Sequence, residues 1–261
     1  MTHPLLIKIV NVLSFVFLLG LNTYSGFFDD SSPYHDNHAT YITPAVFVYY
    51  IWVLIHFLLL GFVIYQFFPV ANEVVVDGIH WHFLSLGLFN GVWVWLYSTD
   101  HTILALIPLL LVSTQVSYVY FTLKNRYPAA TFGETVWIHA PFSLYHGWIF
   151  VLTVIGVFVA FSPEKTDEPP SVLTKIFVVI GLLFLELTAT SYIEKFEGDI
   201  AGAIVIAWSL YGVAAEQQDP VIHWAAIIFA VFTTIHIIKP LFKKYVLKTR
   251  EEQTPLVRGQ V

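Results

Sequence analysis

Long apolar runs alternate with short polar stretches along almost the whole chain. Each run is close to the length that a helix needs to cross a hydrocarbon core of ~30 Å. A helix also satisfies its backbone hydrogen bonds internally, so each run is expected to be a transmembrane α-helix. The predicted fold is an all-α polytopic bundle in one domain. Eight helices are predicted, over residues 5–24, 44–68, 79–97, 103–123, 136–161, 172–192, 200–215 and 221–242, with seven as the alternative count.

Composition supports an integral membrane protein and excludes several other classes. Hydrophobic residues make up 57% of the chain and charged residues only 11%, against roughly 25% charged residues in soluble domains. The net charge of −6, with no basic segment between aromatic residues, argues against nucleic acid as a partner. The chain has no cysteine, which excludes disulfides, thiolate metal sites and cysteine nucleophiles.

The basic residues predict an orientation. An eight-helix count places ten of the twelve on the side that carries both termini. The excess of Lys and Arg on cytosolic loops then puts both termini in the cytosol, in a membrane that the sequence does not identify. With seven helices the bias would largely cancel. The ten are Lys8, Lys124, Arg126, Lys195, Lys239, Lys243, Lys244, Lys248, Arg250 and Arg258, and the other two are Lys165 and Lys175.

Polar side chains inside the apolar runs are the candidate functional groups, because lipid offers them no partner. Trp52 and His56 are four residues apart and share one helix face. At a rise of 1.5 Å per residue, His56, Asn90 and His146 lie roughly 15–18 Å from a membrane boundary, in the middle layer. We therefore expect one pocket between the second, third and fifth helices, lined by Trp52, His56, Asn90, Trp93, Tyr145 and His146.

Such a layer suits a planar ligand, with rings to stack on it and donors to bind its polar edge. The plainer alternative is that each histidine is bonded to a neighbouring carbonyl or hydroxyl. Asn90 would then only join two helices.

Three stretches in order carry a resemblance to a known family. They are Thr43-Pro-Ala followed by Ile51-Trp52, then Asn90-x-x-Trp93, then Pro141-Phe-Ser-Leu-Tyr-x-Gly-Trp-Ile149. They resemble the TspO/MBR family, the tryptophan-rich sensory proteins related to the translocator protein, or peripheral benzodiazepine receptor. Ala207-Trp208-Ser-Leu-Tyr-Gly212 is similar to a segment of longer members. The resemblance divides the chain into a five-helix part, 1–162, three additional helices, 163–242, and a basic cytosolic tail, 243–261.

The resemblance implies a membrane protein that binds a porphyrin, a sterol or a similar flat apolar ligand, in a sensory or transport role. Four positions depart from the family pattern and touch the implied pocket. Thr43, Val46, His56 and Gly156 stand where short members carry proline, tryptophan, tyrosine and asparagine. No obligatory cofactor is expected, and a porphyrin or haem would be a reversible ligand. Membrane lipid and the small hydrophobic ligand are the expected partners, and a homodimer stays open.

Glu186 supports a different function class, because it is the one acidic residue well inside an apolar run. Counting along the helix places it near the depth of His236. A pair of Glu186 with His236 or Lys239 would be a structural clamp or part of a proton path. The alternative function is therefore a transporter or channel using Glu186 and the intramembrane histidines. A membrane enzyme acting on a tetrapyrrole is a weaker alternative.

Haem is a competing use of the histidines. The chain has no C-x-x-C-H motif, so covalent attachment is excluded. A haem with two histidine ligands would need His56 with His146, or His139 with His236. The chain also lacks a P-loop, a dinucleotide-binding glycine motif and a zinc-protease motif.

Overall fold

The computed structural model describes residues 3–35, 37–195 and 199–242. Within these residues the protein is all helical, which confirms the predicted fold class. Eight α-helices have 15 or more residues. They are α1 (Pro4–Phe27), α2 (Ile51–Tyr65), α3 (His82–Ser98), α4 (Thr102–Arg126), α6 (Ala140–Phe161), α7 (Val172–Glu194), α8 (Ile200–Glu216) and α9 (Pro220–Phe242).

Short helical segments extend or connect the long ones. A 3₁₀ turn, Val46–Tyr50, leads directly into α2, and α5 (Phe132–Glu134) with a π-helical segment, Thr135–His139, leads into α6. A 3₁₀ turn, Pro69–Ala71, and a second π-helical segment, Val74–Ile79, join α2 to α3. Six of the described helices, with their extensions, are long and apolar enough to cross a membrane. The helices α3 and α8 have 17 residues each, so each spans roughly 25 Å.

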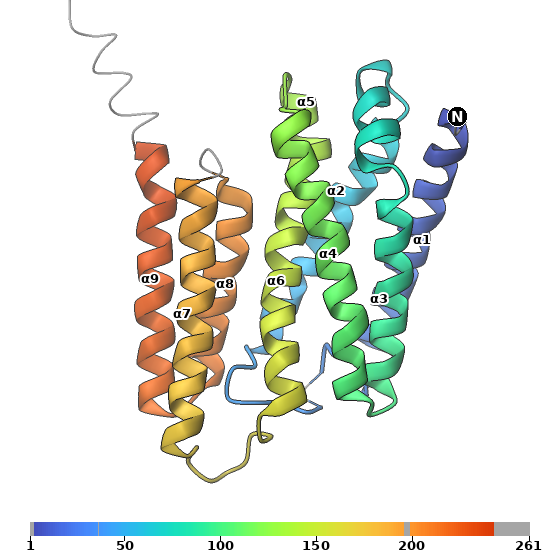
Figure 1. Cartoon of the computed structure of the whole chain (residues 1–261). Coiled ribbons are helices and arrows are strands. Elements are labelled where there is room, and N and C mark those ends of the chain that lie inside the picture. The colour runs from blue at the N-terminus through green and yellow to red at the C-terminus, as the bar shows by residue number, and fades with distance from the viewer. Residues whose placement is uncertain (1–2, 36, 196–198, 243–261) are drawn as a thin grey trace, which may run out of the picture.

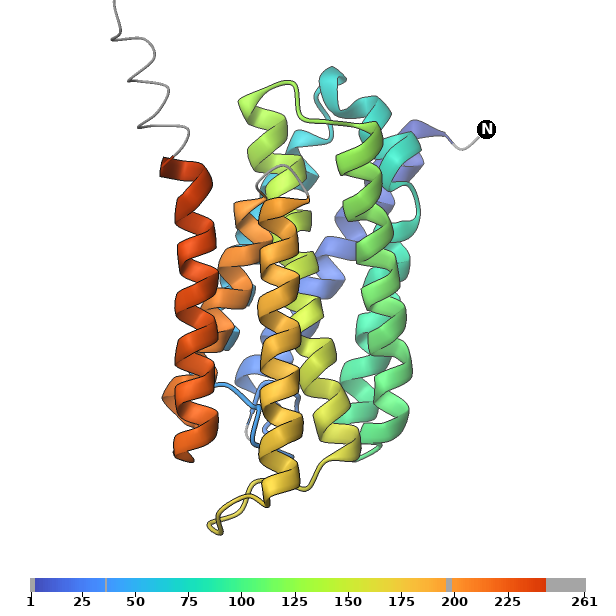
Figure 2. The same cartoon turned by 60° about the vertical axis from the view of Figure 1, so that its left-hand side comes forward.

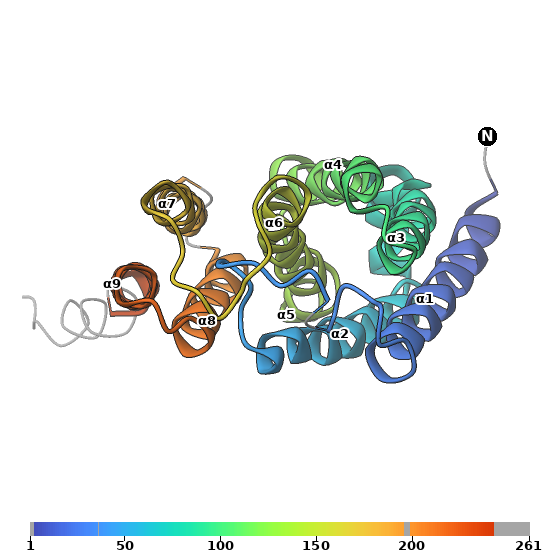
Figure 3. The same cartoon turned by 90° about the horizontal axis from the view of Figure 1, so that it is seen from below.

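Five helices form a closed ring. The contacting neighbours run α1–α2, α2–α6, α6–α4, α4–α3 and α3–α1, and the view along the bundle axis shows the ring directly (Figure 3). The centre is filled with side chains, since Phe62, Phe83 and Phe142 are completely buried and pack edge to face. The ring contains α2, α3 and α6, on which the three motif stretches lie.

The other three helices pack on one side of the ring (Figures 1 and 2). The helices α7, α8 and α9 contact one another, and α8 also contacts α6 and the turn before α2. Glycines allow the close approach of α8 to α6. A Cβ on Gly147 would lie 2.7 Å from the backbone oxygen of Gly202, so the two backbones meet there with no side chain between them.

The start of α1 and the end of α9 lie at the same end of the molecule, and the loop between α6 and α7 lies at the other (Figure 1). An even number of crossings requires this arrangement. The cytosolic side of the termini stays a prediction. The predicted basic tail, 243–261, lies outside the described residues.

Residues 28–35 and 37–45, here called the capping loop, cover one end of the ring (Figure 3). Tyr34 and Ile42 of this loop are buried, with 5% and 0% of their surface exposed. Its last residues are tied to α8 and to the residue after it, because Ala45 donates its N–H to the oxygen of Gly212 and Gln217 donates to the oxygen of Thr43. We call the ring end under this loop the capped end.

Candidate functional site

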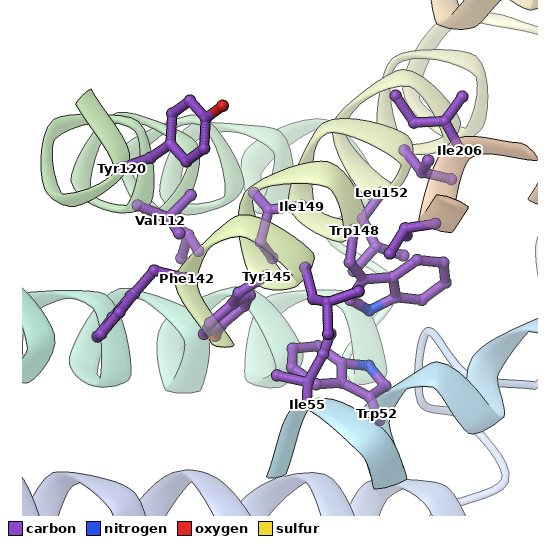
Figure 4. Close-up of a cluster of buried hydrophobic side chains, with 14 of the residues drawn as sticks. Trp52, Ile55, Val112, Tyr120, Phe142, Tyr145, Trp148, Ile149, Leu152 and Ile206 are labelled. Carbon is purple, nitrogen blue, oxygen red and sulfur yellow. The ribbon is translucent and has the colours of Figure 1, made fainter. Parts of the chain in front are cut away.

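Six aromatic side chains, here called the aromatic cluster, fill the ring beneath the capping loop. Trp52 of α2 is central, with its ring centroid 5.2 Å from that of Tyr145 and 6.2 Å from that of Trp148, both on α6. Figure 4 shows these three side chains facing one another. Tyr34 of the capping loop lies against Trp52 at 6.2 Å. The cluster consists of Tyr34, Tyr49, Trp52, Trp93, Tyr145 and Trp148.

Most of the rings in the cluster meet edge to face. This geometry places the positive edge of one ring on the negative face of the next and is more favourable than a direct face-to-face stack. In each of these pairs the edge of one ring covers part of the face of the other. A flat ligand can stack inside the ring of helices only if at least one of these side chains turns away.

Polar atoms in and beside the cluster lack partners. Both side-chain amide atoms of Asn90, the hydroxyl of Tyr145 and the indole nitrogen of Trp148 are buried without a hydrogen bond to any described residue. Asn90 is three residues before Trp93 and shares its helix face. A buried polar group without a partner costs about 1–3 kcal/mol, so these atoms are available to hydrogen-bond with any group that reaches them.

A chain of hydrogen bonds links the capping loop to His56. The Tyr34 hydroxyl donates to Asn22 Oδ1 over 2.6 Å, and Asn22 Nδ2 lies 3.3 Å from His56 Nε2. His56 Nδ1 lies 2.7 Å from the oxygen of Trp52, which can only accept, so Nδ1 carries the proton. His56 Nε2 is therefore the acceptor, and the neutral ring is held in one tautomer and one orientation.

Open space lies at the side of the cluster rather than in its centre. A groove of about 320 Å³ between α1 and α2 is lined by Asn22, Trp52 and His56 together with apolar side chains such as Phe15 and Phe57. In contrast, the void under the capping loop, next to Trp93 and Tyr97, measures only about 20 Å³. Trp52 belongs both to the groove and to the aromatic cluster, so it joins the two.

The structure brings most of the predicted site residues together. The aromatic cluster contains Trp52, Trp93 and Tyr145. His56 lies in the groove beside Trp52, and Asn90 lies one turn from Trp93. His146 does not join them. Adjacent residues on a helix point about 100° apart, so Tyr145 faces the ring centre and His146 faces α4 and α7.

His146 has partners of its own. Its ring stacks on Tyr120 with centroids 4.4 Å apart, and its Nε2 lies 2.9 Å from the Ser117 hydroxyl. Its Nδ1 is hydrogen-bonded to the Tyr192 hydroxyl of α7. His56 and His146 thus sit in separate clusters, and the structure does not support one haem between them. The residues that the structure describes contain no group of three His, Asp or Glu side chains arranged to hold a metal ion.

The predicted pairing of Glu186 was wrong. Glu186 accepts from the Thr190 hydroxyl, one turn along the same helix, at 2.9 Å. His236 bonds the oxygen of Phe232 within its own helix, and Lys239 pairs instead with Glu194 at 2.7 Å. The pair was suggested only by the similar depth of these residues in the membrane. Their side chains point in different directions around their helix axes, so they do not meet. Among the described residues these side chains therefore form no continuous hydrogen-bonded chain, and the transport path stays a prediction.

Sequence reasoning missed Tyr34, Asn22 and Asp199. Tyr34 lies in a polar loop with no periodic pattern, so nothing in the sequence signals that its ring turns inward. Asp199 precedes α8 and accepts from the Tyr120 hydroxyl at 2.8 Å and the Ser143 hydroxyl at 2.7 Å. Its position directly before an apolar run is typical of a helix cap, which was the available signal.

One comparison with known proteins gives a match. The sequence model of the family described as "TSPO-like protein" matches residues 8–239 of the chain. The match runs through all eight long helices, so the likeness continues past the ring into α7, α8 and α9. No curated protein and no solved structure is significantly similar to the chain.

Proposed function

The chain belongs to the family of TSPO-like proteins, and we propose that it binds a flat hydrophobic ligand, a tetrapyrrole or a sterol, against Trp52 and His56. The observation that carries this proposal is the groove between α1 and α2, whose lining includes both side chains. Its volume of about 320 Å³ lies within the range of ~300–1,000 Å³ typical of small-molecule pockets. The binding would serve a sensory or transport role in a multi-pass membrane protein.

The groove has the chemistry that such a ligand needs. Most of its lining is apolar, with Phe15, Phe27 and Phe57 among the side chains. Asn22 and His56 supply the polar groups, and both are already oriented by hydrogen bonds. A ligand with an extended apolar face and a polar edge matches this division.

Binding can extend into the aromatic cluster through Trp52. A rotation of this indole would expose the ring of Tyr145 behind it. The unpartnered atoms of Asn90 and Tyr145 would then become available to the polar edge of the ligand. The departure from the family pattern at His56 lies in this same groove, so ligand preference is expected to differ from that of members with tyrosine there.

The test is a titration of the purified protein with protoporphyrin, followed by absorbance and by quenching of tryptophan fluorescence. Trp52→Ala should weaken binding by about 1–3 kcal/mol if the indole stacks on the ligand. The matched control is Trp95→Ala, because Trp95 is 64% exposed on α3 and lies outside the groove and the cluster. Equal affinity of both variants and the parent protein would remove the support for this site.

A fluorescent sterol titrated in the same way separates the two ligand classes. His56 Nε2 accepts hydrogen bonds, so a sterol hydroxyl can donate to it, whereas the carboxylates of a tetrapyrrole can only accept and would bind the Asn22 amide. His56→Phe should therefore reduce sterol binding more than protoporphyrin binding. Failure of both ligands to bind the parent protein would refute the proposed function.

A further inference from the structure

The capping loop closes the ring above the aromatic cluster. The small void beneath it is lined by loop residues, including Pro33 and His38, and by Trp93, Tyr97 and Leu152 of the ring. Tyr34 of the loop covers Trp52 and Trp93, with centroid distances of 6.2 and 6.1 Å. Access to the cluster from the capped end therefore requires this part of the loop to lift.

His38 joins the capping loop to two other segments at the capped end. Its Nδ1 lies 2.6 Å from Glu164 Oε1, in the loop between α6 and α7. Its Nε2 lies 3.0 Å from Asp100 Oδ1, in the turn between α3 and α4. The ring also packs edge to face on Tyr97, at 5.7 Å. We call the three side chains His38, Asp100 and Glu164 the latch.

Backbone geometry also marks the latch. His38 and Asp100 both have positive φ angles, 58° and 59°. Non-glycine residues adopt this conformation at a cost and keep it where the surroundings enforce it. Two latch residues held in this conformation, from different segments, indicate that the contact between them is part of the closed arrangement.

The latch needs a protonated imidazole. An ionised carboxylate can only accept hydrogen bonds, and both ring nitrogens of His38 face one. The imidazolium donates from both nitrogens, whereas a neutral imidazole donates from only one. Deprotonation therefore removes one hydrogen bond and both ion pairs together. Partial burial lowers the pKa of His38, but the Glu164 and Asp100 carboxylates outweigh it and hold the pKa above the ordinary value of 6.5.

The other titratable groups near the latch have partners elsewhere, except His35, which lines the same void and whose Nε2 is buried without a partner among the described residues. Lys165, next to Glu164, pairs with Glu216 at 2.7 Å. In the loop, Asp29 accepts from the hydroxyls of Ser31 and Ser98, and His101 lies beside the Thr99 hydroxyl. Asp36 lies outside the described residues. Within the part of the chain that the structure describes, Asp100 and Glu164 are therefore the charges that act on His38.

We propose that the latch is a pH-controlled gate over the capped end of the ring. Protonated His38 holds the loop closed, and loss of that proton releases the segment around Tyr34. Residues 40–45 stay anchored, because Thr43 and Ala45 are bonded to Gln217 and Gly212. The opening of the loop is proposed independently of any ligand. The further step, that an open loop admits ligand to the cluster, rests on the function proposed above.

The direction of the pH effect follows from linkage. Closure raises the pKa of His38, so the latch contributes fully below the pKa of the open state. That contribution is lost as the pH rises through the higher pKa of the closed state. Each unit of pKa difference between the two states changes the closing equilibrium about tenfold. The loop should therefore open more often in mildly alkaline than in mildly acidic solution.

The absence of cysteine allows a direct test without ligand. Leu152→Cys places a single thiol in the void under the loop, at a position that is 3% exposed. A membrane-impermeant maleimide should label it faster as the pH rises. All thiols react faster at higher pH, so each rate is divided by that of Asp167→Cys, on the exposed α6–α7 loop, at the same pH. The ratio should increase with pH in the protein with an intact latch.

Two further variants in the Leu152→Cys background make the test specific. His38→Gln cannot supply two opposed charged donors, so its ratio should be high at every pH. Asp100→Asn should do the opposite, because an amide can donate to neutral His38, and asparagine tolerates the positive φ angle. The labelling ratio of this variant should stay low up to a higher pH than that of the protein with an intact latch. A ratio that does not change with pH in the intact latch, or His38→Gln matching the parent, would overturn the gate. Loss of porphyrin binding alone would leave it standing.

Discussion

At the scale of single residues, the direction in which a side chain points around its helix axis was harder to predict than its depth in the membrane. Tyr145 and His146 lie at almost the same depth, as predicted, yet they face different neighbours. Tyr145 packs on Trp52 and His146 on Tyr120. Composition and span lengths contain no information on which side of a helix faces the next one. The family pattern marks both Trp52 and Trp93, and in the structure both contact Tyr34.

Gly147 offers a residue-scale prediction. Gly147→Ala should lower the melting temperature in detergent, because the new Cβ would lie 2.7 Å from a backbone oxygen of α8 that cannot rotate away. Overpacking of this kind costs typically about 1–3 kcal/mol. The matched control is Gly20→Ala in α1, where no atom lies within 4 Å of the new Cβ. If both substitutions had the same effect, the contact between α6 and α8 would not be as close as described.

At the scale of elements, the apolar runs predicted the long helices within a few residues at most ends. The pattern did not show that the run from residue 44 begins with a 3₁₀ turn, or that π-helical segments precede α3 and α6. Local apolar content is the same in each helix type, so only backbone packing separates them. The capping loop lies in a polar stretch between two apolar runs, yet its Tyr34, Tyr41 and Ile42 side chains are buried.

Asp199 joins the second group of helices to the ring. It begins α8, accepts the N–H of Ala201, and binds the hydroxyls of Tyr120 in α4 and Ser143 in α6. Lys124 Nζ lies 3.1 Å from Asp199 Oδ2, the oxygen that also accepts from Tyr120. A single buried carboxylate thus connects three long helices. The hydrogen bonds from Tyr120 and Ser143 and the ion pair with Lys124 all run from the ring to this residue at the start of α8.

Asp199→Ala should therefore destabilise the contact between α8 and the ring. The helix cap is worth roughly 1 kcal/mol, and the buried Ser143 hydroxyl would lose its acceptor at a cost of about 1–3 kcal/mol. Thermal melting in detergent measures the total. Limited proteolysis of the loop between α6 and α7 reports whether α7, α8 and α9 separate from the ring. Asp199→Asn keeps a cap and an acceptor, so it should have a smaller effect. An alanine variant as stable as the asparagine variant would argue against the carboxylate as the connection.

At the scale of the whole molecule, the charge distribution and the fold agree on an even number of crossings. The described basic side chains at the end opposite the capping loop include Lys8, Lys124 and Lys239, and the capped end has Lys165 and Lys175. This asymmetry was visible in the sequence, because it depends only on the order of charges and spans. The resemblance implied a part with five helices, whereas their arrangement as a closed ring comes from the structure. The placement of α7, α8 and α9 beside α6 was not implied either, because it depends on glycine contacts and on Asp199.

The last prediction concerns which end faces the cytosol. The excess of basic residues places both termini there, so the latch and the capping loop should face the opposite compartment. A reporter fused after residue 261 should be active only in the cytosol. The single thiol of Asp167→Cys should react with an impermeant maleimide applied to that opposite compartment. Three helices, α7, α8 and α9, lie between residue 167 and the end of the chain. Both signals on one side of the membrane would mean that these helices do not cross it three times. Both signals reversed would place the termini outside, and His38 would then respond to cytosolic pH rather than to the pH of the other compartment.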